Sequence, residues 1–206
     1  MRKFKQMKRI LHIISSPRNG QSISIQLGDK VIEKLLQQYP GSTVTVNNVV
    51  DNDYDHLSVD HVTGYLSPAD QHTPEQKAVI KASDEAVEEL LAADLVVISL
   101  PIYNFNLPSA LKAWIDHIIR AGKTFSYATG RPEGLLNGKK AYLAIASSGV
   151  YSDGPMKEWD HAEPYLRFIL GFIGLRDVTT FRVEGLNFPG IKETALEKGL
   201  ESVVVA

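Results

Sequence analysis

The sequence has no cysteine among its 206 residues. This excludes disulfides, thiolate metal sites and cysteine nucleophiles. A chain without cysteine also shows no sign of an oxidising, secreted context, so we expect a cytoplasmic protein. The basic start of the chain is followed by only a short apolar run, and we expect it to lead into the first strand rather than to act as a targeting signal.

The chain also lacks a large charge of one sign and a long apolar run. Its 22 basic and 24 acidic residues give a formal net charge of -2. A nucleic-acid partner is not expected, because phosphate neutralisation needs a strong basic surplus. A membrane partner is not expected either, because no stretch approaches the ~20 apolar residues that span a bilayer. The length suits one domain over residues 1–206.

Apolar, β-branched runs alternate with segments of helical spacing. The runs predicted to be strands are Ile10–Ile14, Val44–Val50, Leu95–Leu100, Ala141–Ala146 and Val178–Val183. The segments predicted to be helices are Ser24–Gln38, Pro74–Ala92, Pro108–Arg120, His161–Phe172 and Ile191–Val204. This alternation predicts an α/β fold with a parallel sheet and helices on both faces. Five strands fit the flavodoxin-like doubly wound order 2-1-3-4-5.

One stretch, residues 51–73, shows no clear periodicity. We expect an irregular insertion there, which at this length is usually functional or a small subdomain. Thr73-Pro74-Glu75-Gln76, at its end, resembles a helix start, with a cap, a proline at the first position and a glutamine three residues after the cap.

Three polar loops should meet at one edge of the sheet, because ligands of such folds bind at the carboxyl ends of the strands. These loops are residues 15–24, 101–108 and 147–155. The first precedes a helix, whose N-terminus attracts anions, and it carries four serine hydroxyls. It contains neither G-x-G-x-x-G nor G-x-x-x-x-G-K-[ST]. It therefore predicts a phosphate site of another kind; the alternative is that its serines only cap the helix.

The second loop places Tyr103 and Phe105 between two prolines, where a planar ligand would explain exposed aromatic rings. The alternative is that both rings cover the core or a subunit contact. The third loop carries Gly149 and Gly154, which allow close backbone approach or positive φ, and also Tyr151. A ligand with a phosphate at one end and a flat heterocycle at the other would span the three loops. Flavin mononucleotide (FMN) has that shape.

The motifs "SSPRNGQSIS", "PIYNFNLPSALKAWID" followed by "RAGKTFSY", and "SSGVYSDGP" resemble those of the bacterial FMN-dependent NADH:quinone oxidoreductases and azoreductases. The similarity covers nearly the whole chain. It implies a flavodoxin-like homodimer with one FMN per subunit near the interface. Two positions depart from the family pattern: Ile102 replaces a common methionine, and Ala146-Ser147-Ser148-Gly149 replaces a common S-R-G-G.

The resemblance assigns individual residues to the cofactor and the substrate. For the FMN phosphate they are Ser16, Ser22, Ile23 and Ser24; for the isoalloxazine, Pro101, Ile102, Tyr103, Asn104 and Phe105; for its pyrimidine edge, Ala146, Ser147, Ser148 and Gly149. The substrate side would be lined by Phe125, Tyr151 and Phe172, with Phe172 supplied by the partner subunit. The alternative for Phe125 and Phe172 is a role in the core or the interface.

The implied reaction is a ping-pong transfer: NADH or NADPH passes a hydride to flavin N5, and a quinone or azo compound then takes two electrons, the azo bond being cleaved to two amines. No catalytic residue is assigned, because the flavin carries the hydride. No metal is expected, since no histidine pair has ligand spacing. The alternative function is a flavodoxin-type electron carrier that docks protein partners, although such carriers are typically strongly acidic.

Overall fold

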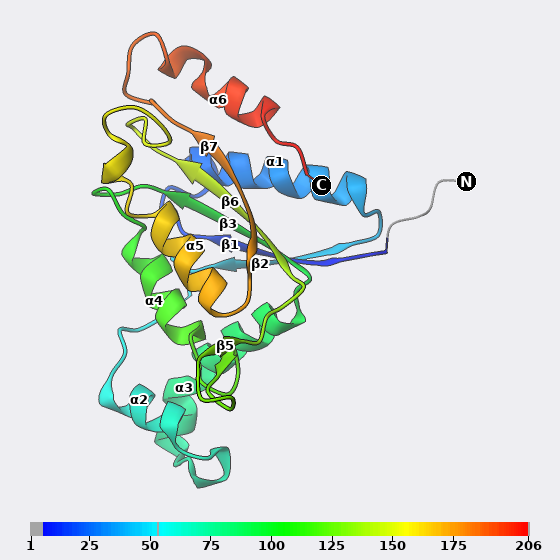
Figure 1. Cartoon of the computed structure of the whole chain (residues 1–206), viewed down its shortest axis with the longest axis vertical. Helices are drawn as coiled ribbons and strands as arrows, with labels where there is room; N and C mark the ends of the chain where they lie inside the picture. Colours follow the sequence, from blue (N-terminus) through cyan, green and yellow to red (C-terminus); the bar gives the residue numbers. More distant parts are fainter. Residues whose placement is uncertain (1–5, 53, 206) are drawn as a thin grey trace.

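The computed structural model describes residues 6–52 and 54–205, so the predicted basic lead-in at residues 1–5 lies outside the described residues. Its main feature is a five-stranded parallel sheet. The strands are β1 (Arg9–Ile14), β2 (Thr43–Asn48), β3 (Leu95–Pro101), β6 (Lys140–Ala146) and β7 (Asp177–Val183). Their order is β2-β1-β3-β6-β7, which confirms the predicted order 2-1-3-4-5 (Figure 1).

Helices cover both faces of this sheet. On one face lie α1 (Ile23–Gln38) and α6 (Lys192–Glu201); on the other lie α3 (Pro74–Ala92), α4 (Ser109–Ile118) and α5 (Glu163–Phe172) (Figure 1). The residues of β3 alternate between the two layers, since Val96 and Ile98 join the α3–α5 core whereas Leu95 and Val97 join the α1–α6 core. The nearly continuous apolar pattern of β3 therefore reflects burial on both faces.

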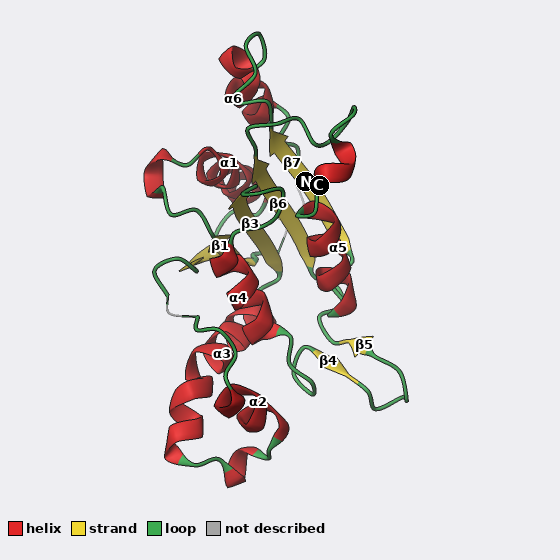
Figure 2. Ribbon diagram, turned by 90° about the vertical axis from the view of Figure 1, so that its left-hand side faces the viewer, coloured by secondary structure: helices red, strands yellow, loops and turns green. Residues whose placement is uncertain are grey.

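The segment 51–73 is helical in its middle, where the sequence predicted irregular structure. It contains α2 (Val59–Leu66) and a 3₁₀ turn at Ala69–Gln71. Ser58 and His61 form a capping box at the start of α2. The segment docks onto α4 through His117, whose Nε2 donates to the carbonyl of Asp55 at 2.8 Å. It forms a small helical extension at the end of the molecule beside α3 (Figure 2).

A short antiparallel hairpin was not predicted. It pairs β4 (Phe125–Ser126) with β5 (Glu133–Gly134). A Cβ on Gly134 would lie 2.1 Å from the backbone nitrogen of Gly174, so the hairpin touches the turn that follows α5. With two residues per strand, the hairpin is too short for the alternation by which strands are recognised in a sequence.

Two predicted helices end earlier than expected, at Ile118 in α4 and at Glu201 in α6. The hydroxyl of Thr124 ends α4, because it donates to the Ile118 carbonyl at 2.7 Å and accepts from the Arg120 N–H at 2.9 Å. The predicted start of α3 is confirmed, with its capping box and Pro74 at the first position. Over the described residues, the structure contains no helix with the length and apolarity that a membrane crossing requires.

Candidate functional site

The three polar loops meet at the carboxyl edge of the sheet, as predicted. The backbone N–H of Ser15, after β1, donates to the carbonyl of Ser99 in β3 at 3.1 Å, and its hydroxyl donates to the same carbonyl at 2.9 Å. The N–H of Ile102, after β3, donates to the carbonyl of Ala146 at the end of β6 at 2.8 Å. The loops are therefore held side by side by the strands that precede them.

The serine loop, residues 15–24, ends in the N-terminus of α1. Ser16, Ser22 and Ser24 are all buried, and the hydroxyls of Ser22 and Ser24 lie 3.0 Å apart. Ser22 occupies the N-cap position, yet its side chain makes no capping bond within the described chain, whereas Thr73 caps α3 through its hydroxyl. The Ser22 hydroxyl therefore does not cap α1, and its burial needs another explanation. The first turn of α1 keeps N–H groups that suit an anion.

The loop after β3 forms a two-residue turn. The N–H and carbonyl groups of Tyr103 and Asn106 bond each other reciprocally at 2.9 Å. Asn104 and Phe105 between them have φ values of 48° and 66°, and they are the only non-glycine residues with positive φ in the described ranges. This is the geometry of a type I′ turn, which normally requires glycine or asparagine. Phe105 is therefore held in a strained conformation.

Contacts from later in the chain hold Phe105 in that conformation. Its carbonyl accepts from the N–H of His161 at 3.0 Å. Its ring meets Tyr151 and Trp159 edge-on, with centroids 6.2 and 5.6 Å away. Tyr151 in turn lies over Gly149, where a Cβ would be 2.7 Å from the Tyr151 ring. We call Phe105, Tyr151 and Trp159 the aromatic wall.

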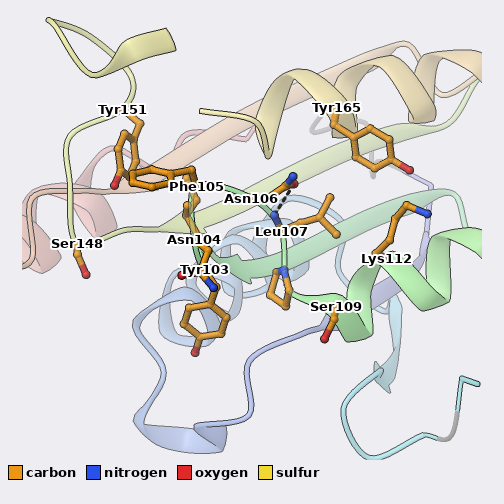
Figure 3. A pocket seen from close by; sticks show the side chains of 12 residues that line it. Tyr103, Asn104, Phe105, Asn106, Leu107, Ser109, Lys112, Ser148, Tyr151 and Tyr165 are labelled. Carbon is orange, nitrogen blue, oxygen red and sulfur yellow. Dashed lines mark hydrogen bonds between the residues drawn. The ribbon is translucent and has the colours of Figure 1, made fainter. Parts of the chain in front are cut away.

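A cleft of about 900 Å³ opens between the second and third loops and helices α4 and α5. It is lined by Ile102, Tyr103, Asn104, Phe105, Asn106, Leu107, Pro108, Ser109, Lys112, Ser148, Tyr151 and Tyr165. Phe105 and Tyr151 stand at one end, and Lys112 and Tyr165 at the other (Figure 3). Among the described lining residues, Lys112 alone is charged, and its Nζ lies 2.6 Å from both carboxylate oxygens of Asp116. A cleft volume of about 900 Å³ is typical of small-molecule sites.

All but two of the predicted site residues fall into two groups around this cleft. Those that line it directly are Ile102, Tyr103, Asn104, Phe105, Ser148 and Tyr151. Those that lie beside it, at the strand ends or in the adjoining loops, are Pro101, Ala146, Ser147, Gly149, Ser16, Ser22, Ile23 and Ser24. In the third loop the Ser147 hydroxyl donates to the Gly149 carbonyl at 2.8 Å, which fixes the backbone next to Ser148.

Phe125 and Phe172 do not line the cleft of this chain. They contact each other, with ring centroids 4.8 Å apart, and Phe172 is the last residue of α5, whereas Tyr165 near the start of that helix reaches the cleft. Within a single chain the two rings therefore pack together at the C-terminal end of α5. Figure 2 shows that this end of the helix lies toward β4 and β5. Their predicted contact with substrate requires a second copy.

Sequence reasoning missed Lys112, Tyr165 and Trp159. Lys112 is in the first turn of the helix that follows the second loop, so the rule that places ligands at this edge could have included it. Tyr165 and Trp159 flank the start of α5, and nothing in the sequence shows that this segment folds back onto the second loop.

A buried histidine lies beneath the serine loop. His12 in β1 is 2% exposed, and its Nε2 lies 2.7 Å from the hydroxyl of Ser99. Burial lowers the pKa of His12 to about 4, so the ring is neutral at neutral pH. Across the described residues, no cluster of histidine, aspartate or glutamate is arranged to hold a metal ion.

Residues 8–205 match the sequence model of a family described by its flavodoxin-like fold. The chain belongs to this flavodoxin-like family. It is 42% identical over 195 residues to the FMN-dependent NADH:quinone oxidoreductase of Mesorhizobium japonicum, and the alignment covers 94% of this chain and 93% of that relative. These findings confirm the family resemblance drawn from the motifs.

Two solved structures of azoreductases are also similar to this chain. An azoreductase from Bacillus anthracis strain Sterne superimposes with a TM-score of 0.87 at 31% identity, over 95% of this chain and 96% of its own. An FMN-dependent NADH-azoreductase from Bacillus anthracis strain Ames Ancestor, solved in complex with FMN, gives a TM-score of 0.82 at 25% identity, over 94% and 97% of the two chains.

The residues of this flavodoxin-like chain fit FMN. Buried hydroxyls at an uncapped helix N-terminus suit a phosphate, which needs donors and a positive partial charge. The cleft beside them offers aromatic borders and, within its described lining, no carboxylate. A flat, polar-edged ring suits that lining better than a cation would.

Proposed function

We propose that this protein is an FMN-dependent NADH:quinone oxidoreductase that also reduces azo compounds. The observation that carries the proposal is the adjacency of two features: an uncapped helix N-terminus with buried serine hydroxyls, and a cleft bordered by a strained aromatic turn. The names of the relatives support the same function, since the chain covers nearly their full length.

In this proposal the serine loop binds the FMN phosphate through Ser16, Ser22, Ser24 and the N–H groups around Ile23. Pro101 to Phe105 and the third loop, Ala146 to Gly149, hold the ring system. Bound FMN would supply hydride transfer in a ping-pong sequence, from NADH to the flavin and then to a quinone or azo acceptor. The protein orients the ring against the cleft.

We also propose a homodimer in the cytoplasm. Phe168 on α5 is 69% exposed, and Phe172 on the same helix face packs against Phe125. A second copy docked on this face would cover Phe168 and bring Phe125 and Phe172 toward a neighbouring cleft. Tyr151, which already lines the cleft of its own chain, completes the proposed substrate contacts.

The first test is an absorbance spectrum of the purified protein after FMN is supplied, followed by anaerobic NADH. Flavin bands that bleach with NADH, and rapid NADH oxidation with menadione, are the expected results. Bands that persist until a separate reductase protein is added would instead support the electron carrier. A protein that takes up no FMN would contradict both functions.

A double change, Tyr103→Ala with Phe105→Ala, tests which residues hold the ring. We expect weaker FMN binding and slower turnover, because both side chains line the cleft. Tyr39→Ala is the matched control, because Tyr39 lies at the opposite end of α1 from the serine loop. Unchanged FMN affinity and turnover in the double variant would contradict the assignment of the second loop.

A further inference from the structure

Arg182 in β7 sits at the centre of a buried charge network. Its side chain is 12% exposed and contacts three carboxylates. Nη1 donates to Glu184 at 3.0 Å and Nε to Glu163 at 3.1 Å, while Nη2 donates to Asp160 and to Glu163. Arg182 therefore joins three acidic groups that lie on different segments of the chain.

The first of these groups, Glu184, holds the third loop. Its Oε1 accepts the backbone N–H of Tyr151 at 2.8 Å and that of Ser152 at 3.0 Å, and the same oxygen accepts from Arg182. The position of the Tyr151 ring, which lines the cleft, is thereby fixed to β7.

The second group, Asp160, holds the start of α5. Its Oδ1 accepts the N–H groups of Ala162 and Glu163 at 2.9 and 3.0 Å, and its other oxygen accepts from Arg182. The residues on either side, Trp159 and His161, contact the ring and the carbonyl of Phe105. Arg182 thus connects to Tyr151 through Glu184. It connects to Trp159 and Phe105 through Asp160 and the two residues beside it.

The buried carboxylates of the network depend on Arg182 for a positively charged partner. The side chains of Asp160, Glu163 and Glu184 are between 5% and 17% exposed. Arg167 is the other cation of the network, and it reaches Glu163 alone of these three carboxylates, at 2.7 Å. Removing Arg182 would leave Asp160 and Glu184 buried without a cation, which is strongly unfavourable.

We propose that Arg182 is a positioning residue that holds the aromatic wall in place and thereby sets the affinity of the cleft for the FMN ring and for the electron acceptor. This inference rests on the proposed function for its ligands. The part that concerns the wall itself rests only on the contacts above, so the two can be tested separately.

The test uses Arg182→Met, which keeps the length of the side chain and removes its charge and donors. Arg167→Met is the matched control, because it also removes an arginine that pairs with Glu163 but leaves Glu184 and Asp160 bound to Arg182. Arg182→Lys is the conservative variant, which restores a charge without the fork that serves several acceptors.

The first readout needs no flavin. Hydrogen exchange at the Tyr151 and Ser152 amides should speed up by about tenfold or more in Arg182→Met, the size expected when a hydrogen bond to a charged group is lost. Acrylamide quenching should also increase, and it reports on Trp159, which is 51% exposed, because Trp114 is fully buried. Amides of β3 and β6 should keep their exchange rates, and Arg167→Met should match the wild type.

The second readout uses the holoenzyme. KM for a quinone acceptor and the Kd for FMN should rise by about fivefold or more in Arg182→Met, while kcat stays within about twofold, because a displaced wall weakens binding but supplies no reacting group. Arg182→Lys should recover part of the affinity, and Arg167→Met should behave as the wild type.

Unchanged exchange at Tyr151 and Ser152 in Arg182→Met, or KM and Kd values equal to those of Arg167→Met, would overturn the proposal. If Arg182→Met does not fold, Arg182→Lys and Glu184→Gln test the proposal by the same exchange and binding measurements, since each keeps a polar side chain at the substituted position. A wild type that binds no FMN would remove the proposed function, and the exchange measurement would still show whether Arg182 positions the wall.

Discussion

The burial of His12 predicts a loss of stability in mild acid. The ring is 2% exposed, its Nε2 bonds the Ser99 hydroxyl at 2.7 Å, and burial lowers its pKa from an ordinary 6.5 to about 4. The Asp29 carboxylate lies 3.9 Å from Nδ1, but it is 65% exposed, so water screens its attraction for a proton on the ring. The folded protein therefore resists the protonation that the unfolded chain accepts.

The direction in which pH changes the free energy of unfolding follows from proton binding. Between pH 6.5 and 4 the unfolded chain protonates His12 and the folded chain does not, so acid favours unfolding. The contribution is complete above pH 6.5 and is lost as the pH falls toward 4. The gap of about 2.5 between the two pKa values is worth about 3 kcal/mol in total, of which about 2 kcal/mol is lost by pH 5. That is a large part of the ~5–15 kcal/mol by which a domain is stable.

Urea unfolding at pH 7.5 and pH 5.0 measures this loss. His12→Gln is the matched variant, because its amide can still bond Ser99 but does not titrate. Burial raises the pKa of Asp29, which acts with the opposite sign, and burial together with His117 lowers the pKa of His61. Asp29 and His61 are present in both the wild type and His12→Gln, so their contributions cancel when the two losses of stability are compared. We expect the wild type to lose about 2 kcal/mol more than His12→Gln; equal losses in the two proteins would refute the reasoning.

Three further changes test the fold around the site. Gly28→Ala should cost about 2 kcal/mol in urea unfolding, because its Cβ would lie 1.9 Å from the Ser99 hydroxyl; a neutral result would mean that α1 can shift away from the sheet. Thr73→Ala should cost about 1 kcal/mol of stability through the lost cap and leave FMN affinity unchanged. Ser22→Ala should lower FMN affinity, measured by flavin fluorescence, about tenfold, and should cost about 1 kcal/mol of stability through the lost hydrogen bond to the Ser24 hydroxyl rather than through a lost cap.

The architecture could be predicted because its signals are local and repeated. Leu95–Leu100 is apolar at every position except Ser99, as a strand buried on both faces requires, and the helices around it show regular spacing. The predicted strand order was that of the flavodoxin-like doubly wound arrangement, which five strands alternating with helices fit. Helix α2 was not predicted because its apolar and polar positions are reversed. Val59, Val62 and Leu66 face solvent, while His61 and Gly64 are buried against the rest of the protein. Its capping box also uses a histidine where glutamate or glutamine is usual.

The site was only partly predictable for a different reason. Loops at the carboxyl edge could be named from topology, and aromatic residues in them suggested a planar ligand. The type I′ turn could not be recognised, because its second central residue is Phe105 where glycine is usual. Arg182 could have been paired with Glu184, which follows two residues later on the same face, but not with Asp160 or Glu163, which come from a distant segment of the chain.

The strain at the second loop connects these observations. A left-handed conformation costs a non-glycine residue about 1–3 kcal/mol, and Phe105 has no small polar side chain to reduce that cost, as Asn104 does. The conformation persists because the His161 N–H holds the Phe105 carbonyl, and because Tyr151 and Trp159 hold its ring. Those residues belong to segments that β7 fixes through Arg182. The shape of the turn is therefore imposed from outside the loop, and a change at β7 should alter the cleft as directly as a change in the loop itself.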